Sequence, residues 1–332
     1  MKASGRIPII IDTDPGIGMP GSDIDDGLAI AYAVRSPRLE VRALTTVVGN
    51  VDVGSGVTNA VRLLRRLGRS DIPVVQGAMR PLVRDMGTVR SAFRRFIDED
   101  EPRDEEPALP PTVPMTAAQY LVEQVRREPG VLAVVGIGPA TNLALAVALD
   151  PAFAGNVGEI VLMAGSTTTY AENMTPVGDF NAFVDPEALA VVLGSGAKVR
   201  MVGLDQTART RFTLGDAKRL RASGDVCNMW LADCADGWIS LLAEAFPNRP
   251  EHREACFLHD PLVLASVVEP NICSWADAYV EVALAESLTR GLVVADRGLA
   301  LLAPRGQWNA RVAVDSDVSG FHREFMGVLL EG

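Results

Sequence analysis

Short apolar segments alternate with helical patterns along most of the chain, and this alternation limits the possible folds more than any other feature. Amphipathic patterns such as Val57–Leu67 and Ala117–Arg127 separate the apolar segments. Strands that are apolar on both faces and are separated by helices are typical of a parallel sheet covered on its two sides. We therefore predict an α/β fold with a Rossmann-like, mostly parallel central sheet flanked by helices. The predicted strands are Ile7–Ile11, Val41–Val48, Ile72–Val75, Val131–Ile137, Glu159–Ala164 and Val199–Leu204.

Two regions interrupt this alternation. Residues 84–111 are rich in charge and proline, which suits either a disordered surface loop or a lid over a pocket. Residues 220–258 are mostly helical, contain Trp230 and Trp238, and predict a helical cap. Because neither region has the composition of a linker and the chain has no internal repeat, we predict a single domain over residues 1–332.

The charge balance argues against several classes of partner. The chain has 31 basic and 42 acidic residues and a net charge of −11, so neither nucleic acid nor an anionic membrane is expected as a partner. No apolar segment is long enough for a signal peptide or a membrane span. The cysteines have no paired metal-ligand spacing and are expected to be free thiols. Together these features predict a cytoplasmic protein.

Five aspartates lie within fifteen residues at the end of the first predicted strand: Asp12, Asp14, Asp23, Asp25 and Asp26. Carboxylates this close repel one another unless a cation neutralises them, and an all-oxygen ligand set suits a hard ion such as Ca²⁺ or Mg²⁺. The alternative is that one or two of them cap the following helix while the others are solvated. Capping does not account for all five, so the pattern favours a metal site.

Polar residues also follow other predicted strands. Asn50 follows the second strand and Thr141 the fourth, and His259-Asp260-Pro261 precedes a helical pattern. In a parallel sheet the carboxyl ends of the strands share one edge, where reactive groups gather. Each of these residues also has a local explanation, because Asn50 and Thr141 suit turns and Asp260 suits the start of a helix.

Taken in this order along the chain, these segments resemble the inosine-uridine-preferring nucleoside hydrolase family. The resemblance covers nearly the whole chain. It implies the nucleoside-hydrolase fold, hydrolysis of ribonucleosides to ribose and free base, one Ca²⁺ ion per subunit, and a homodimer or homotetramer. The segments that carry it are 12–16 with 25–26, 44–50, 57–60, 72–74 with 77–78, 138–142, 161–163, 173–177, 179–181, 185–188, 201–205, 259–261, 289–291 and 312–315.

The resemblance also implies roles for individual residues. Asp14 would bind the metal and take the proton of the attacking water, and Asp26, Asp260 and the backbone carbonyl of Thr141 would complete the metal site. His259 would donate a proton to the leaving base. The ribose hydroxyls would be held by Asp25, Asn50, Met163, Asn173, Asp179 and Asn181.

This chemistry needs such groups for a general reason. Splitting a ribosidic bond builds positive character on the sugar and negative charge on the base. Water attacks well only when a cation lowers its pKa and a carboxylate takes its proton, and His259 is the best-placed proton donor near neutral pH. Trp230 or Trp238 could stack on the base, although buried aromatic residues more often belong to the core.

Three features depart from the family pattern. Residues 18–24 are an insertion between Asp14 and Asp25, and Asp23 within it is a further candidate for the site. Asp179 stands where the family usually has glutamate. The histidine often found after the third strand is absent, since the only histidines are at 252, 259 and 322. These departures leave the preferred base open.

Two other functions fit part of the pattern. Asp12-Thr13-Asp14 after a strand is also typical of haloacid-dehalogenase-type Mg²⁺-dependent phosphatases, but there a glycine usually follows the second aspartate, where this chain has Pro15. A nucleoside- or ribose-binding protein without turnover would keep the pocket and tolerate the departures just described. A phosphomonoesterase assay tests the first alternative, and nucleoside binding without release of ribose would indicate the second.

Overall fold

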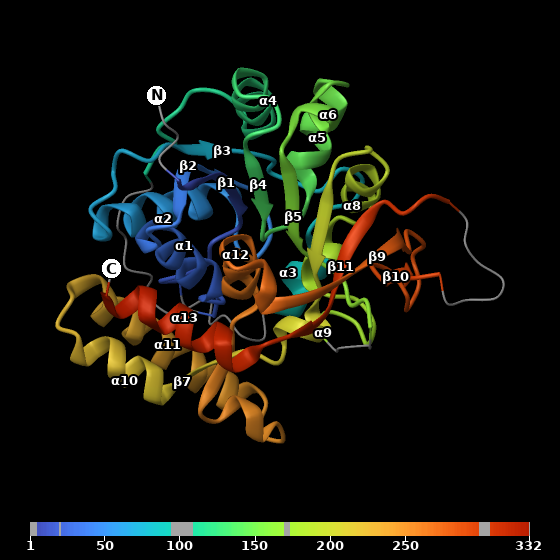
Figure 1. The fold of residues 1–332 in the computed structure, drawn as a ribbon. Helices are drawn as coiled ribbons and strands as arrows, with labels where there is room; N and C mark the ends of the chain where they lie inside the picture. Colours follow the sequence, from blue (N-terminus) through green and yellow to red (C-terminus); the bar gives the residue numbers. More distant parts are fainter. Residues whose placement is uncertain (1–4, 20, 94–108, 169–172, 299–305, 332) are drawn as a thin grey trace.

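The computed structural model describes residues 5–19, 21–93, 109–168, 173–298 and 306–331. All six predicted strands are present, and they lie side by side in parallel. They are β1 (Ile7–Thr13), β2 (Leu39–Thr46), β3 (Val74–Gln76), β4 (Ala133–Gly136), β5 (Glu159–Met163) and β6 (Val199–Val202). Their order in the sheet is β6-β5-β4-β1-β2-β3 (Figure 1).

Three further strands, which the sequence did not predict, extend the sheet beyond β6. They are β9 (Cys273–Val282), β10 (Val293–Asp296) and β11 (Ala310–Ser316). β11 pairs with β6 in parallel, and β9 and β10 follow as antiparallel strands, so the described sheet reads β10-β9-β11-β6-β5-β4-β1-β2-β3. The mostly parallel α/β fold predicted above is therefore confirmed.

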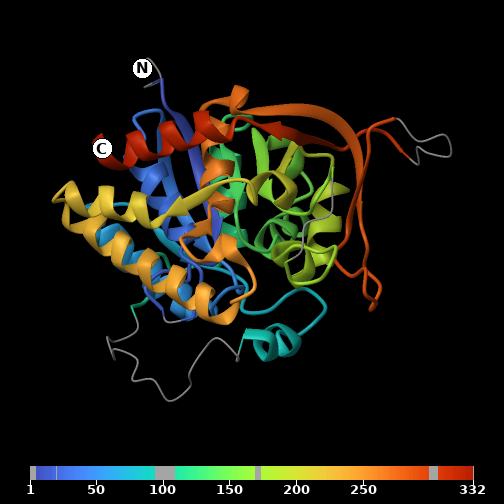
Figure 2. The same ribbon diagram turned by 90° about the horizontal axis from the view of Figure 1, so that it is seen from below.

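Helices cover both faces of the sheet (Figures 1 and 2). None of the helices in the described ranges has the length and apolar character that crossing a bilayer requires. The helices are α1 (Asp25–Arg35), α2 (Val53–Arg66), α3 (Gly87–Phe93), α4 (Ala117–Arg127), α5 (Thr141–Leu149), α6 (Phe153–Asn156), α7 (Phe180–Val184), α8 (Pro186–Leu193), α9 (Leu204–Thr207), α10 (Leu214–Ala222), α11 (Val226–Ala245), α12 (His259–Val268) and α13 (Val318–Glu331), with the 3-10 turns η1 (Pro250–His252) and η2 (Pro270–Ile272).

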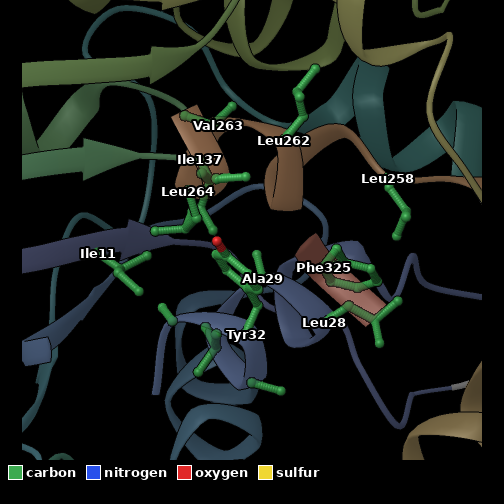
Figure 3. Packing of buried hydrophobic residues seen from close by; sticks show 14 of the residues in the cluster. Ile11, Leu28, Ala29, Tyr32, Ile137, Leu258, Leu262, Val263, Leu264 and Phe325 are labelled. Atoms are coloured by element: carbon green, nitrogen blue, oxygen red, sulfur yellow. The ribbon is translucent and has the colours of Figure 1, made fainter. Parts of the chain in front are cut away.

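The apolar segments are continuous because the sheet is buried on both faces. In β1, Ile9 and Ile11 belong to the core that contains α1, α12 and α13, whereas Ile10 belongs to the core that contains α4, α5 and α8. Figure 3 shows Ile11, Leu28 of α1 and Leu264 of α12 in the first of these cores. Full burial of such a side chain stabilises the fold by about 1.5–3 kcal/mol, so this packing holds α1 and α12 against the same face of the sheet.

The predicted cap region, residues 220–258, contains the end of α10 and all of α11, and these two helices lie side by side. A small antiparallel sheet of β7 (Arg211–Thr213) and β8 (Ala255–Phe257) joins it to α12. Within the predicted loop or lid at 84–111, the structure has α3, and residues 94–108 lie outside the described part of the chain. The four cysteines are free thiols, as the sequence predicted.

Candidate active site

The carboxyl end of β1 lies where the order of the strands reverses. The strand is flanked by β2 on one side and by β4 on the other, and open α/β sheets bind ligands at such a switch point. Asp14 directly follows β1 and Asn50 follows β2, while Ile137 follows β4. Three loops from neighbouring strands thus meet at one place, as the sequence predicted.

Asp26 connects the start of α1 to this strand end. Its Oδ1 accepts hydrogen bonds from the Thr13 hydroxyl and from the backbone nitrogen of Asp14, at 3.2 Å for the latter. Its Oδ2 accepts from Nδ2 of Asn50 at 3.0 Å. These donors fix the carboxylate of Asp26, which is fully buried, beside that of Asp14.

Asp25 connects α1 to α12. Its Oδ2 accepts hydrogen bonds from the backbone nitrogens of His259 at 3.1 Å and Asp260 at 3.3 Å. The first amides of a helix have no partner within the helix, and Leu258, at the N-cap of α12, has no side-chain oxygen to accept from them. Asp25 therefore caps α12 from another helix and places Asp260 beside α1.

The carboxylates of Asp25, Asp26 and Asp260 converge as a result. Each offers one oxygen atom, and these atoms lie within 4.8 Å of one another. All three residues are buried and lie in the first turns of α1 and α12, where the positive ends of the helix dipoles favour negative charge. A divalent cation that prefers oxygen ligands fits such a group.

Asp14 lies next to this triad with an unused oxygen. Its Oδ2 accepts from the backbone nitrogen of Asn50 at 2.7 Å, whereas its Oδ1 is buried without a hydrogen-bond partner among the described groups. A Cβ atom added to Gly49 would lie 1.9 Å from Oδ2, and one added to Gly138 would lie 2.6 Å from Oδ1. Glycine at both positions leaves the room that the carboxylate occupies. A buried and unpartnered carboxylate oxygen is the second feature that fits a cation here.

The pKa values of these aspartates also reflect the crowding. Burial, with the negative charge of Asp26 as the next cause, raises the pKa of Asp14 well above its ordinary value. Burial and neighbouring carboxylates likewise raise the pKa values of Asp25 and Asp260, and burial raises the pKa of Asp26 to about 6. A cation among them would oppose these shifts by favouring the ionised forms.

Asp12, the first aspartate of the motif, has a different position. Its Oδ1 accepts from the Thr45 hydroxyl at 2.5 Å and from Nδ2 of Asn142 at 2.7 Å, and burial raises its pKa to about 7. Asp12 thus links β1 to β2 and α5. The Thr141 hydroxyl donates to Asp185 at 2.7 Å, so its side chain is occupied, and the metal role predicted for its backbone carbonyl stays a prediction.

A cavity of about 690 Å³ lies beside the carboxylates, a size that suits a small-molecule ligand. Asn181 donates from Nδ2 to the carbonyl oxygens of Ile137 at 2.9 Å and Met163 at 3.0 Å, which leaves its carbonyl oxygen to accept from a ligand. The predicted site residues that line the cavity are Asp25, Asn50, Met163, Asn173, Asn181, His259 and Asp260.

Asp179 is not among the residues that line this cavity. Its Oδ1 accepts from the backbone nitrogens of Gly165 at 2.8 Å and Ala182 at 3.1 Å, so it caps α7, and burial raises its pKa to about 6. The carboxylate positions the segment that carries Asn181. Its predicted contact with ribose stays a prediction.

His259 lines the cavity at the start of α12. Its Nδ1 lies 2.8 Å from the Thr207 hydroxyl, and burial lowers its pKa to about 4, so the ring is neutral at pH 7. If the Thr207 hydroxyl donates to Nδ1, the proton of the neutral ring is on Nε2. Thr207, in α9 just after β6, was not predicted, although its position after a strand end was a usable signal.

Residues of the predicted cap region also line the cavity. Of the two tryptophans considered for stacking, Trp238 lines the cavity. Trp230 instead stacks against Arg66, whose guanidinium carbon lies 4.6 Å from the centroid of the indole ring. It also lies beside Gly18 of the insertion. The other lining residues from the cap are Leu242, Phe246, Arg249, His252 and Phe257. Asp23 of the insertion also lines the cavity.

The fold and this site define an α/β enzyme with a buried carboxylate cluster beneath a ligand cavity. Residues 9–323 match the family model described as inosine-uridine preferring nucleoside hydrolase. The chain belongs to this nucleoside hydrolase family, and it is thus a hydrolase that acts on N-glycosyl compounds. Family membership decides against the phosphatase alternative.

Individual relatives agree with this assignment. The chain is 32% identical to a probable uridine nucleosidase 2 of Arabidopsis thaliana over the full length of both chains. It is also 32% identical to the pyrimidine-specific ribonucleoside hydrolase RihA of Citrobacter koseri, over 95% of each chain. Among solved structures, the plant nucleoside hydrolase PpNRh1 is 30% identical and superposes with a TM-score of 0.81, covering 98% of this chain and 99% of the other.

Proposed function

We propose that this enzyme splits the N-glycosidic bond of ribonucleosides with water, giving ribose and free base, and that it does so with one Ca²⁺ ion held by Asp14, Asp26, Asp260 and the Thr141 carbonyl. The observation that supports this most is the convergence of Asp25, Asp26 and Asp260 beside the cavity, next to the unpartnered oxygen of Asp14. When bound, the ion would supply the positive charge that makes a water molecule easier to deprotonate.

Asp14 is the proposed general base. Its Oδ2 is fixed by the backbone nitrogen of Asn50, while its Oδ1 has no donor among the described residues and can accept a proton from water. The positive charge of a bound cation would keep the Asp14 carboxylate ionised, which is the form that can take a proton from water.

The ribose is proposed to lie at the carboxylate end of the cavity. Asp25, Asn50, Asn173 and Asn181 supply acceptors and donors for its hydroxyl groups, and Met163 gives an apolar contact. Fixing the ring in this way would hold the anomeric carbon in line with the attacking water, which is a large part of the advantage over reaction in solution. Asp179 would contribute through the position of Asn181 as well as by any direct contact.

His259 is proposed to assist the leaving base. With Nδ1 oriented by Thr207, its Nε2–H can donate to the base as negative charge develops there. Because burial lowers its pKa to about 4, the ring would act at pH 7 as a neutral donor rather than as a preformed cation.

A nucleoside panel tests the proposal. Inosine, adenosine, uridine, cytidine and nicotinamide riboside are assayed for free ribose with metal-free protein and after addition of Ca²⁺. We expect ribose from at least one nucleoside, and only with the ion. Binding of nucleosides without any release of ribose would favour the alternative of a binding protein. We also propose a cytoplasmic location, because the cysteines are free thiols, and, from the family resemblance alone, a homodimer or homotetramer.

A further inference from the structure

The cap end of the cavity carries a histidine that the proposed mechanism does not use. His252, in η1, lines the cavity together with Leu242 and Phe246. If the ribose lies at the carboxylate end, as proposed above, the base occupies this end, which is mainly apolar and aromatic and therefore suits a planar ring.

Aromatic neighbours hold the His252 ring in place. Its centroid lies 5.5 Å from that of Phe246 and 5.5 Å from that of Phe257, with the second pair edge to face at 88°. Phe257 also contacts His259, with centroids 5.4 Å apart. His252 and His259 therefore lie on the same aromatic row, with Phe257 between them.

The hydrogen bonds of His252 indicate where its proton is. Nδ1 is buried and has no partner among the described residues. A buried N–H without an acceptor is rare in proteins, so the lack of a partner favours the tautomer in which Nδ1 carries no proton. Burial also lowers the pKa of His252, which favours the neutral ring. The proton of that ring is therefore assigned to Nε2, which gives His252 a single N–H donor at the cavity that it lines.

We propose that His252 is a specificity-determining residue, which donates its Nε2–H to a carbonyl oxygen of the leaving base and so favours oxo bases over their amino counterparts. An exocyclic amino group is itself a donor, and it would face this N–H without an acceptor between them. The proposal rests on the proposed function, because it places the base at the cap end.

The test compares matched substrates. The ratio of kcat/KM for inosine to that for adenosine, and for uridine to that for cytidine, is measured in the wild type, His252→Phe and His252→Gln. A loss common to both substrates of a pair cancels in the ratio. We expect the wild type to prefer the oxo member. His252→Phe should lower each ratio about 3- to 10-fold, the effect of one hydrogen bond between neutral groups.

Two variants make the result specific. His252→Gln keeps an N–H donor without the ring, so it should retain more of the ratio than His252→Phe. His322→Phe, the same replacement outside the residues that line the cavity, should leave the ratio unchanged. A wild type that prefers amino bases, or equal ratios in the wild type and His252→Phe, would overturn the role of His252, as would equal losses in the Phe and Gln variants.

Failure of the proposed function is distinguishable from failure of this inference. If the wild type releases ribose from no nucleoside, the proposed function is wrong. The role of His252 is then decided by the dissociation constants of the same substrate pairs, measured by titration calorimetry in the wild type and both variants. An affinity ratio in favour of the oxo base that falls most in His252→Phe and less in His252→Gln supports the role of His252. Equal affinity ratios in the wild type and His252→Phe reject that role.

Discussion

The carboxylate oxygen Oδ2 of Asp25 lies 3.3 Å from the backbone nitrogen of Asp260, although 235 residues separate them in the chain. This contact brings the start of α12 to the start of α1. It also determines where the Asp260 carboxylate lies. Asp260 is the second residue of α12, so its position is set by where the first turn of that helix is held. The contact that packs the two helices together therefore also forms the candidate metal site.

The first prediction separates the capping role of Asp25 from its charge. Asp25→Asn keeps a side-chain oxygen that can accept from the α12 amides, whereas Asp25→Ala does not. In metal-free protein, we expect the alanine variant to have the lower free energy of unfolding, by about 1 kcal/mol, the usual size of a helix cap. Urea unfolding measures the difference. Equal stabilities of the two variants would show that the contact contributes nothing.

The second prediction concerns pH and metal removal. Burial raises the pKa of Asp23 to about 7 and that of Asp26 to about 6, against about 4 for an aspartate in an unfolded chain. Between these values the metal-free folded protein holds more protons than the unfolded chain, so its free energy of unfolding should fall as the pH rises from about 4 to 7. Ca²⁺ binds the ionised carboxylates, so its stabilising effect should grow over the same range.

The measurement is the melting temperature of dialysed protein with and without excess Ca²⁺ at pH 5 and pH 8. We expect the larger difference at pH 8. Asp26→Asn is the control, and it should reduce that difference. A Ca²⁺ effect of the same size at both pH values would contradict the account of the cluster.

The third prediction tests the general base. Asp14→Asn changes few atoms but removes the carboxylate that would take the proton, so kcat should fall by about 10²- to 10⁴-fold. Asp14→Ala should lose at least as much, and circular dichroism should show an intact fold in both. Activity within a few-fold of the wild type in Asp14→Asn would rule out this role.

The fourth prediction tests His259. Loss of a donor to the leaving base should matter for natural nucleosides and matter little for p-nitrophenyl riboside, whose leaving group needs no proton. His259→Ala should therefore reduce kcat/KM much more for the nucleosides. Thr207→Val, which removes the partner of Nδ1, should show a weaker form of the same bias. Equal losses on both substrates in His259→Ala would indicate a purely structural role.

The parallel half of the sheet was predictable because its strands are buried on both faces and are therefore apolar throughout. The three C-terminal strands were not, since they lack that pattern. In β9, for example, Ser274, Asp277 and Glu281 are exposed, and the strand alternates irregularly between buried and exposed residues. An antiparallel extension at the edge of a sheet leaves a weaker trace in the sequence than a central parallel strand.

The candidate site was predictable where residues follow strand ends, as Asp14 and Asn50 do. Contacts between distant segments were not. No local pattern indicates that Asp25 caps α12, that Asp179 binds the Gly165 amide, or that Asp12 links β1 to β2 and α5. The sequence also did not show which residues of the cap region line the cavity, because an apolar residue on a helix gives the same pattern whether it faces a cavity or the core.

The most direct test of the account is a calorimetric titration of metal-free protein with Ca²⁺, compared with the same titration of Asp260→Asn. If the aspartates of α1 and Asp260 share one cation, the wild type binds one ion per chain, and the variant, folded by circular dichroism, binds it at least tenfold more weakly. Unchanged affinity in Asp260→Asn, or no binding by the wild type, would contradict it.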